Sequence, residues 1–507
     1  MPQTALEIAV VVLFALGFAT LGVLHTRGRV KGIEDFITAR GSMGLGVGVA
    51  TIAASVLGAW ILFSPAESAT FAGVVGVLGY AVGQAAPFVA FAVVGPRMRA
   101  LMPQGHSLTE YVWFRYGRAM YGAVLAIMVF YMFVFLAAEL TAIALAVNLV
   151  AGVPLWATAL VLGATTVAYT TYGGLKASIF TDSIQALFIF PLLVAALVTA
   201  VVGLGGLGEI GRGVSAAAPQ LLSWGHRLGI ETAVGLVVAI LAANLFHQGY
   251  WQRVYACRDD TVLRGAFLWG ALAVIPAIFL AGAFGLMAVG AGVVEVPSVA
   301  LFSLILAVLP EWAILVVLVL AVALVMSSVD TLLNGIVSVL TADLHRLRPA
   351  LEPGRLLRTG RWATVALAGL AVLIASQGYS VLYLFLIADL VCAAALVPAF
   401  AGLYSRRLSG GAAVASFVLG LAVGTLFFPT PSFAGWLPIP YSGSLMVSFL
   451  AALALSGAAT LLLSRRGPIS PGRPGGGGGG PRGGWGPRGG GAPRGPPPPG
   501  VGQGRPR

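Results

Sequence analysis

The chain has 507 residues, of which 59% are hydrophobic and only 9% are charged, and its mean hydropathy is +0.96. A water-soluble fold cannot cover that much apolar surface, whereas a bilayer solvates it in spans of about 20 residues. The formal net charge of +12 is better explained by cationic cytoplasmic loops than by nucleic-acid binding. The two cysteines, Cys257 and Cys392, are too few for a disulfide framework. The sequence therefore predicts an all-α polytopic membrane protein.

Thirteen apolar stretches of membrane-spanning length follow one another along the chain. The segments between them alternate between basic and nearly charge-free, so the basic segments all lie on one side of the membrane. Of the 29 Lys and Arg residues, only Arg212 and Arg227 lie on the other, nearly charge-free side. On the positive-inside rule the basic side is cytoplasmic, so we expect the amino terminus outside and the carboxyl terminus inside. We place the spans at residues 5–25, 43–66, 71–96, 119–150, 154–173, 179–204, 229–251, 262–290, 311–342, 361–378, 380–404, 409–428 and 442–464.

The second and seventh spans contain features that interrupt a helix. Gly58 and Pro65 lie in the second span among small hydroxyl residues, and the seventh is polar and contains Gly249. Five spans separate the two, which is the spacing of an inverted repeat in which each half begins with a broken helix. The predicted parts are a leading helix and cytoplasmic loop at 1–42, a first repeat at 43–205, an extracellular loop at 206–228, a second repeat at 229–405, two further helices at 406–466 and a disordered Gly/Pro/Arg-rich cytoplasmic tail at 467–507.

Four carboxylates, Glu139, Asp182, Asp330 and Asp389, lie inside or at the edge of predicted spans. A charge at membrane depth costs several kcal/mol, about 3 on insertion scales, so each needs a partner, a watery cavity or a function. Polar residues of the seventh and ninth spans join them, and together they predict a hydrated path through the bundle. This pattern is typical of a transporter.

Two segments resemble sequence motifs of the sodium:solute symporter family. They are "YTTYGGLKASIFTDSIQALFIF" at 169–190 and "ALVMSSVDTLLNGIVSVLTADLH" at 323–345, with further matches between residues 30 and 405. The resemblance implies a leucine-transporter-type fold of five plus five helices with extra flanking helices, about thirteen spans in all. It also implies that the protein is not an enzyme, and no catalytic constellation contradicts this.

The resemblance further implies a sodium site between the broken second span and the ninth span. Carbonyl oxygens of Ala53, Val56 and Leu324 and hydroxyls of Ser327 and Ser328 would supply the hard oxygen ligands that a sodium ion prefers. Asp182 matches the family residue associated with sodium release towards the cytoplasm, although Phe180 replaces the usual Trp. Capping of the sixth span is the alternative role for Asp182.

For the organic solute, "ANLFHQG" resembles a segment of sodium–galactose symporters. The resemblance implies solute contacts by Asn244, Phe246, His247 and Gln248, facing Ser55, but the aromatic pair that would stack on a sugar ring is absent. We therefore expect another small polar solute, such as proline, a small carboxylate or a compact nitrogenous compound. Glu139 and Asp389 are candidate coupling or proton sites. Glu139 could instead contact a cationic solute or pair with a neighbouring helix.

The function predicted from the sequence is sodium-coupled import of a small organic solute by alternating access in the plasma membrane. Sodium is expected as the co-transported ion. The expected partners are the lipid bilayer and the solute, and no nucleic-acid partner is expected. Two alternatives remain open. One is coupling to protons through Glu139, Asp389 or His247, and the other is a solute sensor that signals through a separate partner.

Overall fold

The computed structural model describes residues 3–27, 38–347 and 352–464. Within these ranges the protein is helical, and β-pairing is limited to one isolated bridge between Met43 and Cys257. The predicted all-α class is therefore confirmed. The predicted tail at 467–507 lies outside the described residues.

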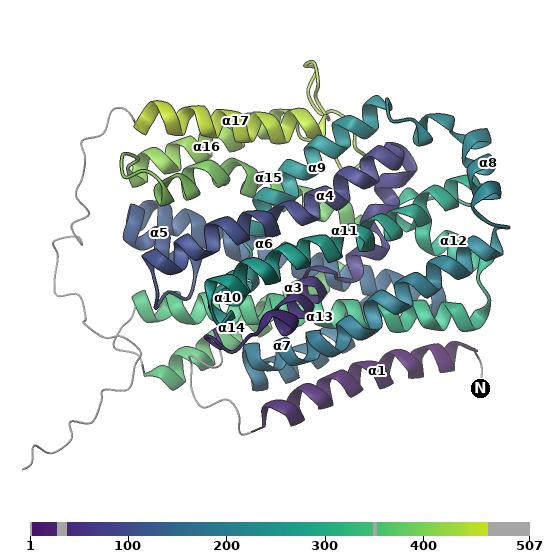
Figure 1. The fold of residues 1–507 in the computed structure, drawn as a ribbon, viewed down its shortest axis with the longest axis horizontal. Coiled ribbons are helices and arrows are strands. Elements are labelled where there is room, and N and C mark those ends of the chain that lie inside the picture. The colour runs from purple at the N-terminus through teal and green to yellow at the C-terminus, as the bar shows by residue number, and fades with distance from the viewer. Residues whose placement is uncertain (1–2, 28–37, 348–351, 465–507) are drawn as a thin grey trace, which may run out of the picture. The chain divides into compact units, whose positions relative to one another are not determined.

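The helices follow the chain in the order of the predicted spans, and Figure 1 shows most of them running roughly along one common direction. The α-helices are α1 (Gln3–Thr26), α3 (Leu45–Val56), α4 (Ser64–Leu101), α5 (Leu108–Tyr116), α6 (Arg118–Ala151), α7 (Leu155–Gly203), α8 (Leu207–Ala217), α9 (Arg227–Leu245), α10 (Gln248–Ala256), α11 (Asp260–Gly290), α12 (Ala300–Val308), α13 (Glu311–Leu347), α14 (Pro353–Ala375), α15 (Val381–Phe400), α16 (Gly410–Phe427) and α17 (Leu445–Ser464). The 3-10 helices are η1 (Ala59–Leu62), η2 (Pro219–Leu222), η3 (Pro297–Val299) and η4 (Ala401–Leu403).

Eleven helices of the described chain are long and apolar enough to cross a membrane. The two other predicted spans, 43–66 and 154–173, correspond to shorter apolar helices. The first of them is α3, which ends at Val56, and the second is the first part of α7, Leu155–Thr170. The thirteen predicted spans thus each have a helical counterpart.

Two predicted gaps between spans are not loops. The chain remains helical through residues 66–71 and 173–179 and changes direction at Gly73 and Gly174. Both glycines have a positive φ, 64° and 57°, which a residue with a Cβ adopts only at a cost. In each place a single glycine, not a connecting loop, changes the direction of the chain. The hydrophobic pattern of the sequence does not indicate these two turns.

Short helices cover the bundle at its two ends. The segment predicted as a loop at 206–228 contains α8 and η2, and the segment 296–309 contains η3 and α12. Figure 1 shows α8 and α12 at the same end as the amino terminus of α1, while α5 and α10 lie towards the opposite end. The basic segments of the sequence border that opposite end.

Small residues allow the central helices to approach closely. α4 packs against α9 and α11, and α13 packs against α6 and α7. At the α4–α11 contact, a Cβ added to Gly285 would lie 2.1 Å from the carbonyl oxygen of Ala66. Close backbone approach of this kind is how helices associate in lipid, where hydrophobic burial supplies little driving force.

Candidate functional site

Both predicted helix interruptions are present in the structure. α3 ends at Val56, Leu57 and Gly58 are extended, and the chain resumes in η1 at Ala59. α9 ends at Leu245, and α10 begins at Gln248 after a two-residue break. Pro65 and Gly249 do not make these breaks, because each lies in the first turn of the following helix, where a proline loses no helical hydrogen bond.

Glu139 of α6 reaches into the first break. Its Oε2 accepts a 2.8 Å hydrogen bond from the backbone N–H of Ala59, and its side chain is fully buried. The carboxylate fills the space beside Gly58, where an added Cβ would lie 1.7 Å from Oε1. Ser328 of α13 is a neighbour of the same carboxylate. Glu139 therefore joins α6 to the interrupted second span by accepting the N–H at the start of η1, a group that has no acceptor within its own helix.

Replacement of Glu139 by alanine is expected to lower the thermal stability of the purified protein, because the buried N–H of Ala59 then loses its acceptor. Leaving such a group unsatisfied costs about 1 to 3 kcal/mol. Glu139→Gln is the matched control, since an amide oxygen can still accept the bond, and we expect it to remain closer to the wild type. Equal melting temperatures for wild type and Glu139→Ala would contradict this role.

The residues of the predicted sodium site come from α3 and α13, which contact each other. All five are buried, and their oxygens already accept or donate hydrogen bonds within the protein. Those contacts are Leu57 N to Ala53 O at 3.3 Å, Gly58 N and Trp60 Nε1 to Val56 O at 3.1 and 3.0 Å, Ser328 Oγ to Leu324 O at 3.2 Å and Ser327 Oγ to Asp182 Oδ1 at 2.6 Å. A cation entering between the helices has to compete with these bonds.

Asp182 of α7 lies at the centre of a fully buried polar cluster. Ser327 donates to Oδ1, and Thr51 of α3 donates to Oδ2 at 2.6 Å. Arg253 of α10 forms a salt bridge with Oδ2 at 2.7 Å, and both side chains have no exposed area. The cluster thus links α3, α7, α10 and α13 at one point, next to the predicted sodium ligands.

In the sequence, Arg253 is one of the basic residues that follow the seventh predicted span, and its burial is not predicted from that position. It is fully buried in α10 and also donates to the hydroxyl of Thr331 and the carbonyl oxygen of Gly249, at 2.9 and 3.0 Å. Its five N–H donors in a planar fork suit such multiple contacts. One sequence signal points this way: Arg253 follows the polar run of the broken helix without an intervening turn residue.

Asp330 lies two positions after Ser328 in α13 and faces α7. It accepts hydrogen bonds from Tyr169 at 2.7 Å, Ser178 at 2.8 Å and Thr181 at 3.1 Å. These contacts satisfy both of its oxygens. Asp330 therefore holds α13 against α7.

A cavity of about 20 Å³ lies between the two interrupted helices and α6 and α15. That volume holds about one water molecule, so a larger solute fits only if the lining side chains rearrange. Among the residues implicated by sequence, Val56, Asn244 and Asp389 line it. The remaining lining residues are Trp60, Tyr80, Gln84, Tyr131, Phe135, Ile240 and Phe385.

The other predicted solute contacts lie outside this lining. Ser55 donates to the carbonyl oxygen of Ile52 in its own helix, and Phe246 packs against Phe400. His247 caps α10 by accepting the N–H of Gly249 and packs edge-on against Phe135, one layer behind the cavity. Gln248 points away and donates to the carbonyl oxygen of His106. The aromatic residues of the lining could not be predicted from the sequence, because they come from four separate segments.

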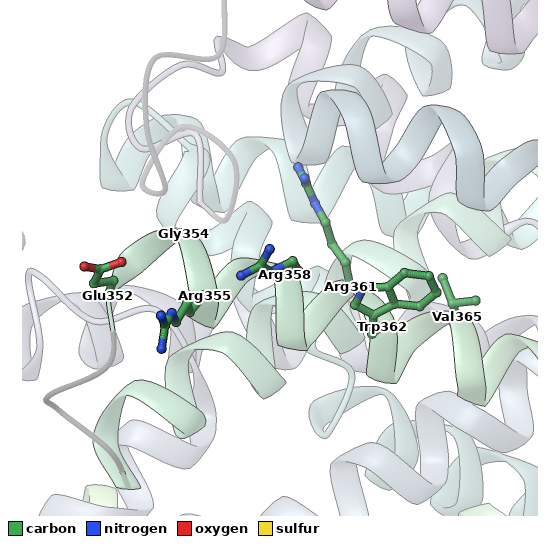
Figure 2. A pocket seen from close by; sticks show the side chains of 7 residues that line it. All are labelled: Glu352, Gly354, Arg355, Arg358, Arg361, Trp362 and Val365. Atoms are coloured by element: carbon green, nitrogen blue, oxygen red, sulfur yellow. The ribbon is translucent and has the colours of Figure 1, made fainter.

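A larger surface hollow, of about 860 Å³, runs along α14 and is shown in Figure 2. Its lining comes from Glu352 and the first turns of α14 alone, including Arg355, Arg358 and Trp362. Figure 2 shows these side chains spaced along one helix without converging on one point. The hollow is separate from the buried cavity and from both helix breaks.

Comparisons with known proteins agree with this architecture. The model of the sodium:solute symporter family matches residues 36–420. The chain belongs to the sodium:solute symporter family. It is 29% identical to a spermidine transporter of Candida albicans over 81% of this chain and 78% of that protein. It is 26% identical to a probable urea active transporter of Schizosaccharomyces pombe, over 81% of this chain and 68% of that one.

Solved structures show the same fold. A Na⁺-coupled sialic acid symporter superposes with a TM-score of 0.73 and 17% identity, covering 90% of this chain and 97% of that chain. A nucleobase-cation-symport-1 family transporter superposes with a TM-score of 0.56 and 16% identity, covering 85% and 95%. The predicted leucine-transporter-type fold and the prediction of a transporter rather than an enzyme are therefore confirmed. The protein is a multi-pass membrane transporter of a solute.

Proposed function

We propose that this transporter is a sodium-coupled symporter that imports a small organic solute by alternating access. The observation that carries the proposal is the small cavity between two interrupted helices, beside the α3–α13 contact where sodium is expected. Interrupted helices at membrane depth are tolerated where they line a cavity, and in inverted-repeat transporters they form the solute and ion sites.

The proposal assigns the two repeats to residues 43–205 and 229–405, the flanking spans to 1–42 and 406–466, and the segment 206–228 to the outer face. The end of the bundle bordered by the basic segments then faces the cytoplasm. This orientation puts the amino terminus outside and the carboxyl terminus inside the cell, in the plasma membrane.

Sodium is proposed to bind the carbonyl oxygens of Ala53, Val56 and Leu324 and the hydroxyls of Ser327 and Ser328. The Ser328 hydroxyl donates to the carbonyl oxygens of Leu324 and Val325 in its own helix at 3.2 Å each, and it also lies beside the Glu139 carboxylate of α6. Turning this hydroxyl towards an ion leaves the backbone hydrogen bonds of α13 intact.

Asp182 is proposed to act in the release of sodium towards the cytoplasm. It already binds the hydroxyl of Ser327, a proposed sodium ligand, and its other partner Arg253 belongs to the half-helix on the basic side of the break. An ion that leaves between α3 and α13 passes a carboxylate whose charge Arg253 compensates. Opening of this path requires the Asp182–Arg253 pair to separate.

The relatives support a solute that contains nitrogen, because one is named a spermidine transporter and another a urea active transporter. Of the solutes expected from the sequence, a compact nitrogenous compound fits these names better than a small carboxylate or proline. Proton coupling is the second candidate mechanism. Glu139 and Asp389 favour it as buried carboxylates for which no salt bridge is found among the described residues.

Uptake from a pool of labelled metabolites into proteoliposomes tests the proposal. An inward sodium gradient is compared with an equal potassium gradient and with a proton gradient. Accumulation that occurs only with sodium supports symport with sodium, whereas accumulation driven equally well by protons alone would contradict it.

Asn244→Ala is expected to weaken solute binding by about tenfold while changing the sodium dependence little. Asn244 lines the cavity, and its Oδ1 has no hydrogen-bond partner, while its amide nitrogen donates to the carbonyl oxygen of Ile240 at 3.0 Å. Loss of one buried hydrogen bond to a ligand costs about 1 to 3 kcal/mol. The measurement is the solute concentration for half-maximal uptake at saturating sodium. Asn148→Ala, in a part-buried residue at the end of α6, is the control, and equal effects of the two changes would contradict the assignment.

A further inference from the structure

One end of the cavity is formed by a buried carboxylate that has no counter-charge. Asp389 of α15 is 5% exposed and lines the cavity, and no hydrogen bond or salt bridge from another described residue reaches it. The other membrane-depth aspartates differ, since Asp182 is paired with Arg253 and Asp330 accepts three hydroxyls. An ionised carboxylate that is buried without a partner is strongly unfavourable, so this group suits a cationic ligand.

The other unsatisfied polar atoms of the cavity are also acceptors. Oε1 of Gln84 and Oδ1 of Asn244 are buried without hydrogen-bond partners. The identity of Oδ1 is fixed, because the amide nitrogen of Asn244 already donates to a carbonyl oxygen. Three oxygen acceptors around one small cavity complement a ligand that carries several N–H groups and no acceptor of its own.

Aromatic rings make up most of the remaining lining. Trp60 stacks on Tyr80 with ring centroids 5.7 Å apart and meets Phe385 edge-on at 5.7 Å. Phe385 in turn meets Phe135 at 4.8 Å, and Phe135 lies 5.9 Å from Tyr131. The faces and edges of these rings form a continuous wall beside the carboxylate. Such walls attract organic cations through the ring quadrupoles, most strongly where water is excluded.

We propose that the solute is a protonated aliphatic amine bearing N–H groups, held by Asp389 against the wall of Trp60, Tyr131 and Phe385. The amine donates to the Asp389 carboxylate and to the free oxygens of Gln84 and Asn244, and its carbon atoms contact the rings. This inference rests on the proposed function and names its substrate class. The proposed site prefers the amine to urea, which has N–H groups but no charge. It also excludes a carboxylate, which Asp389 repels.

Three probes separate the two requirements of charge and N–H donors. 1,4-Diaminobutane has both, tetramethylammonium has charge alone, and urea has N–H groups alone. Binding of each to the purified full-length transporter is measured by calorimetry at fixed sodium. We expect 1,4-diaminobutane to bind most tightly. Tighter binding of urea, or tetramethylammonium binding as tight as that of the diamine, would overturn the proposal.

Asp389→Asn tests the carboxylate itself with an isosteric side chain. Truncating a buried charge pair has large effects, and we expect the affinity for 1,4-diaminobutane to fall at least about thirtyfold. Glu311→Gln removes an exposed carboxylate at the start of α13 and is expected to change nothing. Phe385→Leu should weaken the diamine by about fivefold. Unchanged diamine binding in Asp389→Asn would overturn the proposal, and so would a change in sodium dependence alone.

If Asp389→Asn does not yield folded protein, Asp389→Glu provides the same test with the charge kept and displaced by one methylene. It is expected to retain diamine binding in preference to urea, and loss of that preference would count against the proposal. Sodium-driven uptake is measured separately. Diamine binding that requires Asp389, without sodium-driven uptake, would refute symport but not the amine site. Sodium-driven uptake of urea without diamine binding would refute the amine site but not symport.

Discussion

Neutralising either Asp182 or Arg253 alone is expected to destabilise the transporter by about 3 to 5 kcal/mol, because the remaining charge stays buried without its partner. The pair is 2.7 Å apart and fully buried, and it joins α7 to α10. Removing both charges in Asp182→Asn/Arg253→Gln should recover most of that loss, since no uncompensated charge remains. Thermal unfolding of the purified variants measures the difference.

The exposed pair of Arg227 and Glu231 provides the matched control, with the arginine 82% exposed. Exposed pairs contribute about 0 to 1 kcal/mol, so Arg227→Gln should have little effect. Similar losses in Asp182→Asn and Arg227→Gln would contradict the structural role of the buried pair. Transport adds a second readout. Asp182→Asn should slow turnover while solute affinity at saturating sodium stays nearly unchanged, and a collapse of that affinity would place Asp182 in the solute site instead.

Ser328→Ala is expected to raise the sodium concentration for half-maximal uptake about tenfold, which corresponds to loss of about 1.4 kcal/mol of ligand interaction. The hydroxyl donates to carbonyl oxygens of its own helix and lies beside Glu139, and its removal takes away one small polar group, so the fold should stay intact. Ser416→Ala in α16 removes an equivalent hydroxyl, bonded to the carbonyl oxygen of Ala412 at 2.9 Å, and should not alter the sodium curve. An unchanged curve in Ser328→Ala with intact transport would refute the proposed sodium site.

Much of the fold could be predicted from the sequence because lipid imposes a simple rule on it. Each span must be apolar and helical to satisfy its backbone, and basic residues mark one side. The two broken helices were also predictable, because polar and small residues at 51–66 and 244–252 are out of place in lipid. The turns at Gly73 and Gly174 were missed, since a single glycine inside a helical pattern does not reveal its φ.

The site could be predicted only where its residues are close in sequence. Asn244 lies next to the break that exposes it, whereas the wall around Asp389 is assembled from α4, α6, η1 and α15. Arg253 looked like a topology signal because a cation beyond a span is usually solvated. Its burial depends on Asp182, 71 positions away. Gly58 looked like a helix breaker, and only the structure shows that Glu139 fills the space beside it.

Sodium movement coupled to the solute tests the central proposal most directly. Proteoliposomes with equal sodium on both sides receive an inward gradient of the transported solute, and entry of radioactive sodium is followed. Coupling is reciprocal, so a solute gradient should drive sodium inward as surely as sodium drives the solute. We predict net sodium entry in the wild type and in Ser416→Ala, and much less in Ser328→Ala. Solute entry with no accompanying sodium, or with protons in its place, would contradict the proposed symport.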